Sequence, residues 1–98
     1  MKEITVQELH DAAGDKPLID VREVDEFAAG HVPGATNIPL SQLAERLHEL
    51  PAEPFDIICQ GGVRSARACE ALEPMGHEVT NVQGGTGAWI SAGFEIER

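Results

Sequence analysis

A cysteine and an arginine flank a glycine-rich stretch in the middle of the chain, and together they could perform nucleophilic chemistry. Cys59 ends the short apolar run 57–59, Gly61 and Gly62 follow, and Arg64 precedes an alanine-rich segment with helical spacing. This pattern predicts a buried strand that delivers the thiol to a tight loop just before a helix begins. Backbone N–H groups in such a loop can bind an anion, and the helix N-terminus adds partial positive charge. We therefore expect Cys59 to have a lowered pKa and to act as a thiolate nucleophile.

The residues that follow Cys59 are expected to bind the anion that the reaction handles. Gly61 and Gly62 suit a backbone with positive φ, which only glycine adopts at little cost. Arg64 could offer a bidentate fork to an oxyanion, or it could pair with a carboxylate such as Asp20. Cys59 could also be an inert buried thiol, but the glycines and the arginine disfavour that interpretation. The candidate site has Cys59 as its catalytic residue and the next six as substrate-binding residues: Gln60, Gly61, Gly62, Val63, Arg64 and Ser65.

Alternating strand and helix patterns predict the scaffold that positions this loop. Strand-like runs at 18–21, 36–38, 55–59 and 79–82 alternate with segments of helical spacing, of which 40–50 is the most clearly amphipathic. The alternation predicts an α/β fold with a mostly parallel central sheet of about five short strands and helices on both faces. Ligands of such folds bind beyond the carboxyl ends of the strands, so the ends of 18–21 and 55–59 should meet at one edge.

The composition narrows the setting and the partners. The 98 residues contain no apolar run of transmembrane length, which predicts one domain over residues 1–98. A net charge of −10 argues against nucleic acid or an anionic membrane as a partner. The two cysteines, in a chain without secretory features, predict reduced thiols and a cytoplasmic location. Because the histidines and cysteines lack metal-ligand spacing, we expect no metal, and we expect no other cofactor.

Three segments of the chain resemble the rhodanese (sulfurtransferase) family. They are Cys59 to Ser65, the Asp20-Val21-Arg22-Glu23 segment that leads to 30–39, and Gly84-Gly85-Thr86-Gly87-Ala88-Trp89. They occur in the family's order and cover nearly the whole chain, so we expect a rhodanese-like fold in one complete rhodanese domain. The resemblance implies that Cys59 attacks the outer sulfur of thiosulfate or a related small anionic donor. It then holds that sulfur as a persulfide and passes it to cyanide, a thiol or an acceptor protein.

The same resemblance assigns roles to residues outside the loop. Asp20 and Arg22 match the family's Asp-x-Arg, which ties a neighbouring segment to the active-site loop, so their implied role is support. His31 lies in a segment that is a structural hallmark of the family and is expected to brace a turn rather than act as a base. Cys69, inside a helical pattern, is interpreted as a packed side chain and not as a resolving cysteine.

Other functions remain open at this stage. Cysteine phosphatases and arsenate reductases share the fold, but their loop has an additional residue between cysteine and arginine, whereas four residues separate Cys59 from Arg64 here. A non-catalytic docking module is a second alternative, although such modules often lack the cysteine. A third is a carrier that delivers persulfide sulfur to a protein partner. Since no Lys or Arg lies between Cys59 and Arg64, thiosulfate need not be the physiological donor.

Overall fold

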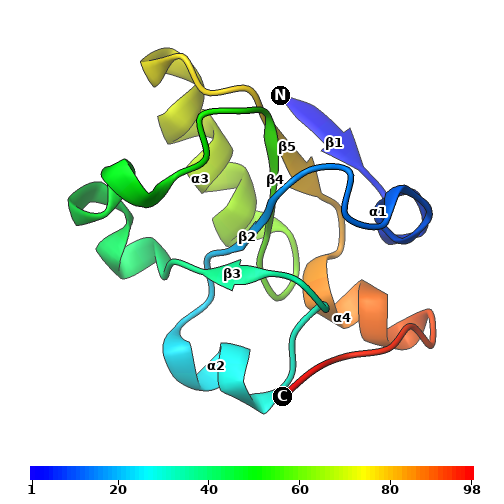
Figure 1. The fold of residues 1–98 in the computed structure, drawn as a ribbon. Helices are drawn as coiled ribbons and strands as arrows, with labels where there is room; N and C mark the ends of the chain where they lie inside the picture. The colour runs from blue at the N-terminus through cyan, green and yellow to red at the C-terminus, as the bar shows by residue number, and fades with distance from the viewer.

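A five-stranded parallel sheet forms the centre of the computed structural model, which describes residues 1–98 (Figure 1). Its strands are β1 (Lys2–Ile4), β2 (Leu18–Asp20), β3 (Thr36–Asn37), β4 (Phe55–Ile58) and β5 (Val79–Val82). The strand order β1-β5-β4-β2-β3 places β4 in the middle, and every neighbouring pair is parallel. The predicted α/β fold with a parallel sheet is therefore confirmed.

Of the four α-helices, three lie between strands along the chain and the last follows β5, and their ends follow local signals in the sequence. They are α1 (Val6–Ala12), α2 (Val24–Ala29), α3 (Val63–Leu72) and α4 (Gly85–Ser91). Helix α1 begins with a capping box, in which the Glu8 backbone N–H donates to Thr5 Oγ1 at 3.1 Å and the Thr5 N–H donates to Glu8 Oε1 at 3.0 Å. These bonds satisfy two of the N–H groups that a helix start leaves unpaired. Helix α3 begins directly after the glycines of the loop.

The central strand contributes to hydrophobic cores on both faces of the sheet. Alternate residues of a strand point to opposite faces. Ile57 packs in a cluster with Leu72 of α3, whereas Ile58 packs in a second cluster with Val6 of α1 and Trp89 of α4. All four residues of β4 are buried, as expected for a parallel strand covered on both sides. The sheet therefore fixes the carboxyl end of β4, where Cys59 begins the loop.

The amphipathic segment 40–50 is helical but not α-helical. It forms two 3₁₀ helices, Leu40–Glu45 and Leu47–Glu49. They are separated at Arg46, whose φ of −118° lies outside the helical range. The leucines of the segment still face the core. Leu43 is buried, and Leu40, Leu47 and Leu50 pack against the same hydrophobic cluster. The spacing therefore predicted the buried face correctly. Two short 3₁₀ helices place these residues on the buried face as well as a continuous α-helix would.

Candidate active site

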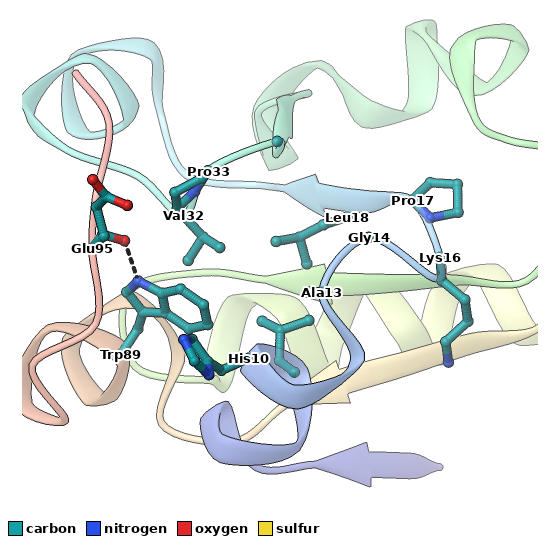
Figure 2. Close-up of a pocket in the computed structure, with 12 residues that line it drawn as sticks. His10, Ala13, Gly14, Lys16, Pro17, Leu18, Val32, Pro33, Trp89 and Glu95 are labelled. Carbon is teal, nitrogen blue, oxygen red and sulfur yellow. Dashed lines mark hydrogen bonds between the residues drawn. The ribbon is translucent and has the colours of Figure 1, made fainter.

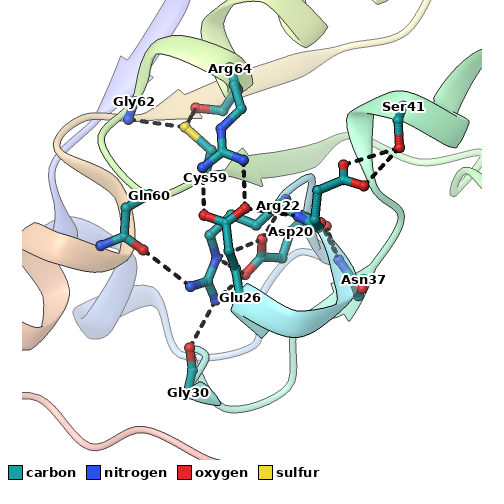
Figure 3. Close-up of polar contacts among 12 residues, drawn as sticks. Asp20, Arg22, Glu26, Gly30, Asn37, Ser41, Cys59, Gln60, Gly62 and Arg64 are labelled. Carbon is teal, nitrogen blue, oxygen red and sulfur yellow. Dashed lines mark hydrogen bonds and ion pairs between the residues drawn. The ribbon is translucent and has the colours of Figure 1, made fainter. Parts of the chain in front are cut away.

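Cys59 follows β4 directly, and its sulfur lies inside the loop that leads to α3. The residue is only 1% exposed. Its Sγ accepts a hydrogen bond from the Gly62 backbone N–H at 3.0 Å and lies 3.2 Å from Ser65 Oγ (Figure 3). Burial raises the pKa of the thiol, but hydrogen bonds from the Ser65 hydroxyl and from backbone N–H groups outweigh burial and lower the pKa below its ordinary value. The loop thus favours a thiolate at this position.

Only one of the two loop glycines has the backbone conformation that was predicted for both. Gly62 is the N-cap of α3 and has φ +100°, in the left-handed region that favours glycine. Gly61 does not have positive φ, and a Cβ added there would meet no atom within 4 Å. The prediction was therefore correct for Gly62 and wrong for Gly61. The chain makes its left-handed turn in a single residue, at the point where the helix starts.

The start of α4 holds the loop from the other side through backbone hydrogen bonds. The Thr86 N–H donates to the Cys59 carbonyl at 2.8 Å, and the Gly87 N–H donates to the Gln60 carbonyl at 3.0 Å. Gly85 has φ +58°, and a Cβ added to it would overlap both of these carbonyl oxygens. This close approach is the physical reason for a glycine-rich segment before α4, for which the sequence provided a resemblance but no role.

Asp20 and Arg22 form a buried pair beside the loop, where their supporting role was predicted. Arg22 Nη2 donates to Asp20 Oδ2 at 2.8 Å and to the Gly30 carbonyl at 2.9 Å, while Nη1 donates to Gln60 Oε1 at 3.2 Å (Figure 3). The Arg22 guanidinium thus connects the end of β2, the end of α2 and the loop that begins at Cys59. Both side chains are satisfied within this network, and neither contacts the Cys59 sulfur.

Arg64 forms an ion pair with Glu26 of α2, and not with Asp20. Its Nη1 and Nη2 donate to the two carboxylate oxygens of Glu26 at 2.7 and 2.8 Å (Figure 3). These hydrogen bonds lower the pKa of Glu26 to about 2 and raise that of Arg64, so both groups are charged. Sequence reasoning missed Glu26. Its position on the short helix after Asp20-Val21-Arg22, at the same sheet edge as Cys59, was the available signal.

Ser65 and Asn81 add a polar chain behind the sulfur. Both residues are buried. Ser65 Oγ donates to Asn81 Oδ1 at 2.5 Å, and Asn81 Nδ2 donates to Glu3 Oε2 at 3.0 Å and to the Gly62 carbonyl at 3.3 Å. Neither Asn81 nor Glu3 was identified from the sequence, since each lies inside a strand outside the motif-bearing segments. A polar asparagine in a strand that begins and ends with valine was the only signal.

Two other residues considered from the sequence lie outside the contacts of the loop. The His31 ring stacks on Phe27 with ring centroids 3.7 Å apart, and its Nδ1 lies 2.8 Å from the Phe27 carbonyl oxygen. These contacts are those of a residue that braces the end of α2. Cys69 is fully buried in α3, and burial raises its pKa to about 12. Cys69 is therefore a neutral, packed thiol.

A cavity of about 510 Å³ lies away from the loop, between α1, the start of β2 and Trp89 (Figure 2). None of its lining residues belongs to the segment 59–65.

No three His, Cys, Asp or Glu side chains lie together where they could hold a metal ion. The helices are all too short or too polar to cross a bilayer. The candidate site is the loop after β4, because it holds the Cys59 sulfur and its hydrogen-bond partners.

Known proteins are similar to this chain in sequence and in architecture. Residues 5–92 match the family model described as a rhodanese-like domain. The chain is 44% identical to the uncharacterized protein YqhL of Bacillus subtilis over 91% of this chain and 72% of that one. It is 36% identical to a protein of Allochromatium vinosum named sulfurtransferase, over 84% and 78% of the two chains. A rhodanese-related protein from Thermoplasma volcanium superposes with a TM-score of 0.94 at 32% identity, over 99% and 98% of the two chains.

Proposed function

The chain belongs to the rhodanese family, and from this we propose that it is a sulfurtransferase in which Cys59 carries the transferred sulfur as a persulfide. The main support is the Cys59 sulfur itself, which accepts the Gly62 N–H, lies 3.2 Å from the Ser65 hydroxyl and has a lowered pKa. The name of the Allochromatium vinosum relative supports the same class of reaction. Four residues lie between Cys59 and Arg64, which favours sulfur transfer over the longer loop of the phosphatases.

The proposed reaction has two half-reactions, and in each a sulfur atom is transferred between nucleophiles. In the first, the Cys59 thiolate attacks the outer sulfur of the donor, which for thiosulfate breaks its S–S bond and releases sulfite with the bonding electron pair. In the second, cyanide or a thiolate attacks the outer sulfur of the persulfide. Thiocyanate or a new persulfide leaves, and the Cys59 thiolate returns. The Gly62 N–H already points at the sulfur and can stabilise the anion without reorganisation, and the Ser65 hydroxyl lies 3.2 Å from the same sulfur.

The test of the proposed function is an intact-mass spectrum of the purified protein after thiosulfate and then after added cyanide. We expect the protein to gain one sulfur atom with the donor and to lose it with cyanide. Cys69→Ala should behave in the same way, because its thiol is buried and neutral. A sulfur gain that maps to Cys69, or no gain with thiosulfate, with polysulfide or with a low-molecular-weight persulfide, would contradict the proposal. A cytoplasmic location remains a prediction.

Within this proposal, we infer that the preferred donor carries less charge than thiosulfate. The terminal nitrogens of Arg64 are bound to the Glu26 carboxylate, so the guanidinium is neutralised and its fork is occupied. Arg22 is likewise paired with Asp20. The loop supplies no other positive side chain, and the chain as a whole carries −10. A donor with a single negative charge, such as the persulfide anion RSS⁻ of a small thiol, fits this environment better than a dianion does.

Replacing Glu26 with glutamine should improve the use of thiosulfate. The amide can still accept the Glu23 N–H bond that Glu26 Oε1 accepts, but it no longer neutralises Arg64. We expect kcat/KM for thiosulfate to rise by about threefold to tenfold at low ionic strength, and the gain to shrink as salt is added.

The matched control for this prediction is Glu49→Gln. Glu49 forms an equivalent bidentate pair with Arg46 at 2.7 Å for both bonds, and it makes no contact with the loop. Its substitution changes the net charge by the same amount and should leave kcat/KM within about twofold. Equal gains in Glu26→Gln and Glu49→Gln would attribute the effect to net charge alone, and a loss in Glu26→Gln would contradict the inferred donor preference.

A further inference from the structure

A chain of hydrogen bonds connects the Cys59 sulfur with the outer strand of the sheet. It runs from Sγ to Ser65 Oγ, from Ser65 to Asn81 Oδ1, and from Asn81 Nδ2 to Glu3 Oε2. Asn81 on β5 and Glu3 on β1 are directly opposed in the parallel register, which holds the two side chains together. Ser65 and Asn81 are buried, whereas Glu3 is exposed. The network therefore places one buried amide between the reactive sulfur and a surface carboxylate.

The neighbours of Asn81 determine which way its amide points. A carboxylate and a peptide carbonyl can only accept hydrogen bonds. Nδ2 donates to Glu3 at 3.0 Å and to the Gly62 carbonyl at 3.3 Å. Oδ1 must then face Ser65, and Ser65 is the only donor that it receives. Two independent contacts thus fix the orientation of the amide.

This orientation determines what the Ser65 hydroxyl can do for Cys59. A serine hydroxyl has one proton to donate. While that proton is on the Asn81 side, Ser65 Oγ can only accept at the sulfur, which suits a neutral thiol. When the sulfur is a thiolate, the proton must turn toward it, and the buried Asn81 Oδ1 loses its donor. An unpaired buried acceptor is unfavourable, so the amide opposes formation of the thiolate.

We propose that Asn81 is a positioning residue that holds the Ser65 proton whenever the Cys59 sulfur is uncharged and releases it when the sulfur becomes an anion. The inference rests on the proposed function, since it concerns the same sulfur. Asn81 also contacts the Gly62 carbonyl, so it reaches both residues that bond the sulfur. In the sulfur-transfer cycle the Ser65 O–H would point at the sulfur while it is a thiolate. The same O–H would turn back to Asn81 Oδ1 once the inner sulfur is neutral in the persulfide.

Two ion pairs near this sulfur remain unchanged in the test, whereas Glu3 loses its Asn81 hydrogen bond in both settings, so that change cancels in the comparison. The groups contributed by the surrounding elements are the Asp20–Arg22 pair at the end of β2, the Glu26–Arg64 pair between α2 and α3, and Glu3 on β1. Cys69 of α3 adds no charge, because burial raises its pKa to about 12. A change in the ionisation of Cys59 on substitution of Asn81 therefore does not require a change in any of these pairs.

The experiment measures the rate of Cys59 alkylation by iodoacetamide as a function of pH, in a Cys69→Ala background that leaves one thiol. Asn81→Ala is compared in two settings, with Ser65 present and with Ser65→Ala. We expect Asn81→Ala to lower the pKa of Cys59 by about one unit more when Ser65 is present, a tenfold difference in the ionisation constant. Any loosening of Gly62 occurs in both settings and cancels in the comparison.

Equal pKa changes in the two settings, or a larger fall in the Ser65→Ala setting, would overturn the inference, because either would exclude an effect through the hydroxyl. Gln83→Ala is the matched control: Gln83 Nε2 donates to Glu3 at 3.1 Å but does not contact Ser65, so the Cys59 profile should not move. If Asn81→Ala does not fold, Asn81→Val provides the same comparison with a residue that favours strands. Since alkylation needs no sulfur donor, the result is independent of whether sulfur transfer itself is observed.

Discussion

Replacing Cys59 with serine should reduce sulfur transfer to the background rate, a loss of roughly a thousandfold or more in kcat. A serine hydroxyl at this site would stay protonated, because its pKa is far above that of a thiol, and the hydrogen bonds that lower the pKa of Cys59 are too few to ionise an alcohol. The oxygen could still accept the Gly62 N–H bond, so the loop should keep its conformation. Steady-state turnover with a sulfane-sulfur donor and cyanide measures the loss directly.

The serine variant is informative only if it is folded. We expect its free energy of unfolding to fall by no more than about 1–2 kcal/mol, since the change is nearly isosteric at a buried, hydrogen-bonded position. Cys69→Ser is the matched control, because it introduces the same polar group at the other buried cysteine, on α3. That control should lose stability and keep its turnover per folded molecule. Substantial turnover in folded Cys59→Ser would exclude Cys59 as the nucleophile.

The local arrangement of the loop was predictable because its signals are contiguous in the sequence. The strand-like run 55–58, the glycine at position 62 and the helical spacing that follows specify strand, turn and helix within a few residues. The parallel sheet followed from the alternation of strands and helices, since parallel neighbours require a crossover. The segment 40–50 marks the limit of this reasoning: hydrophobic spacing identified its buried face but could not separate an α-helix from two 3₁₀ helices.

The partners of the loop residues were not predictable, because they depend on tertiary packing between distant segments. Arg64 pairs with Glu26, 38 positions earlier, and Ser65 bonds Asn81, 16 positions later. The segment after Arg22 also holds Glu23 and Asp25, so the sequence places a carboxylate at this sheet edge but does not single out Glu26. The choice of partner also changes the chemistry: an Arg64 free to bind an oxyanion would favour thiosulfate, whereas an Arg64 bound to Glu26 does not. The proposed donor preference therefore rests on the structure, and the proposed nucleophile on the sequence.

Replacing Gly85 with alanine should damage both the fold and the site, because this glycine is where α4 meets the active-site loop. Gly85 has φ +58°, and an alanine there would cost about 1–2 kcal/mol for its conformation alone. Its Cβ would also lie 2.7 Å from the Gln60 carbonyl oxygen and overlap the Cys59 carbonyl oxygen. Both oxygens accept backbone bonds from α4, so the loop can yield only by breaking them. We expect a total loss of about 2–5 kcal/mol in the free energy of unfolding.

The loss of activity in Gly85→Ala should exceed what unfolding explains. A shift of the Cys59 carbonyl moves the sulfur relative to the donors of Gly62 and Ser65, and a displacement of about 1 Å can lower the rate roughly a hundredfold. Gly93→Ala isolates this effect, because Gly93 also has positive φ, at +81°, but an added Cβ would meet no atom within 4 Å. That variant should lose only the conformational term, about 1–2 kcal/mol, and keep its kcat. Denaturant unfolding and turnover below the unfolding transition separate the two effects. Equal stability losses with unchanged turnover in both variants would show that the contact between α4 and the loop does not position the sulfur.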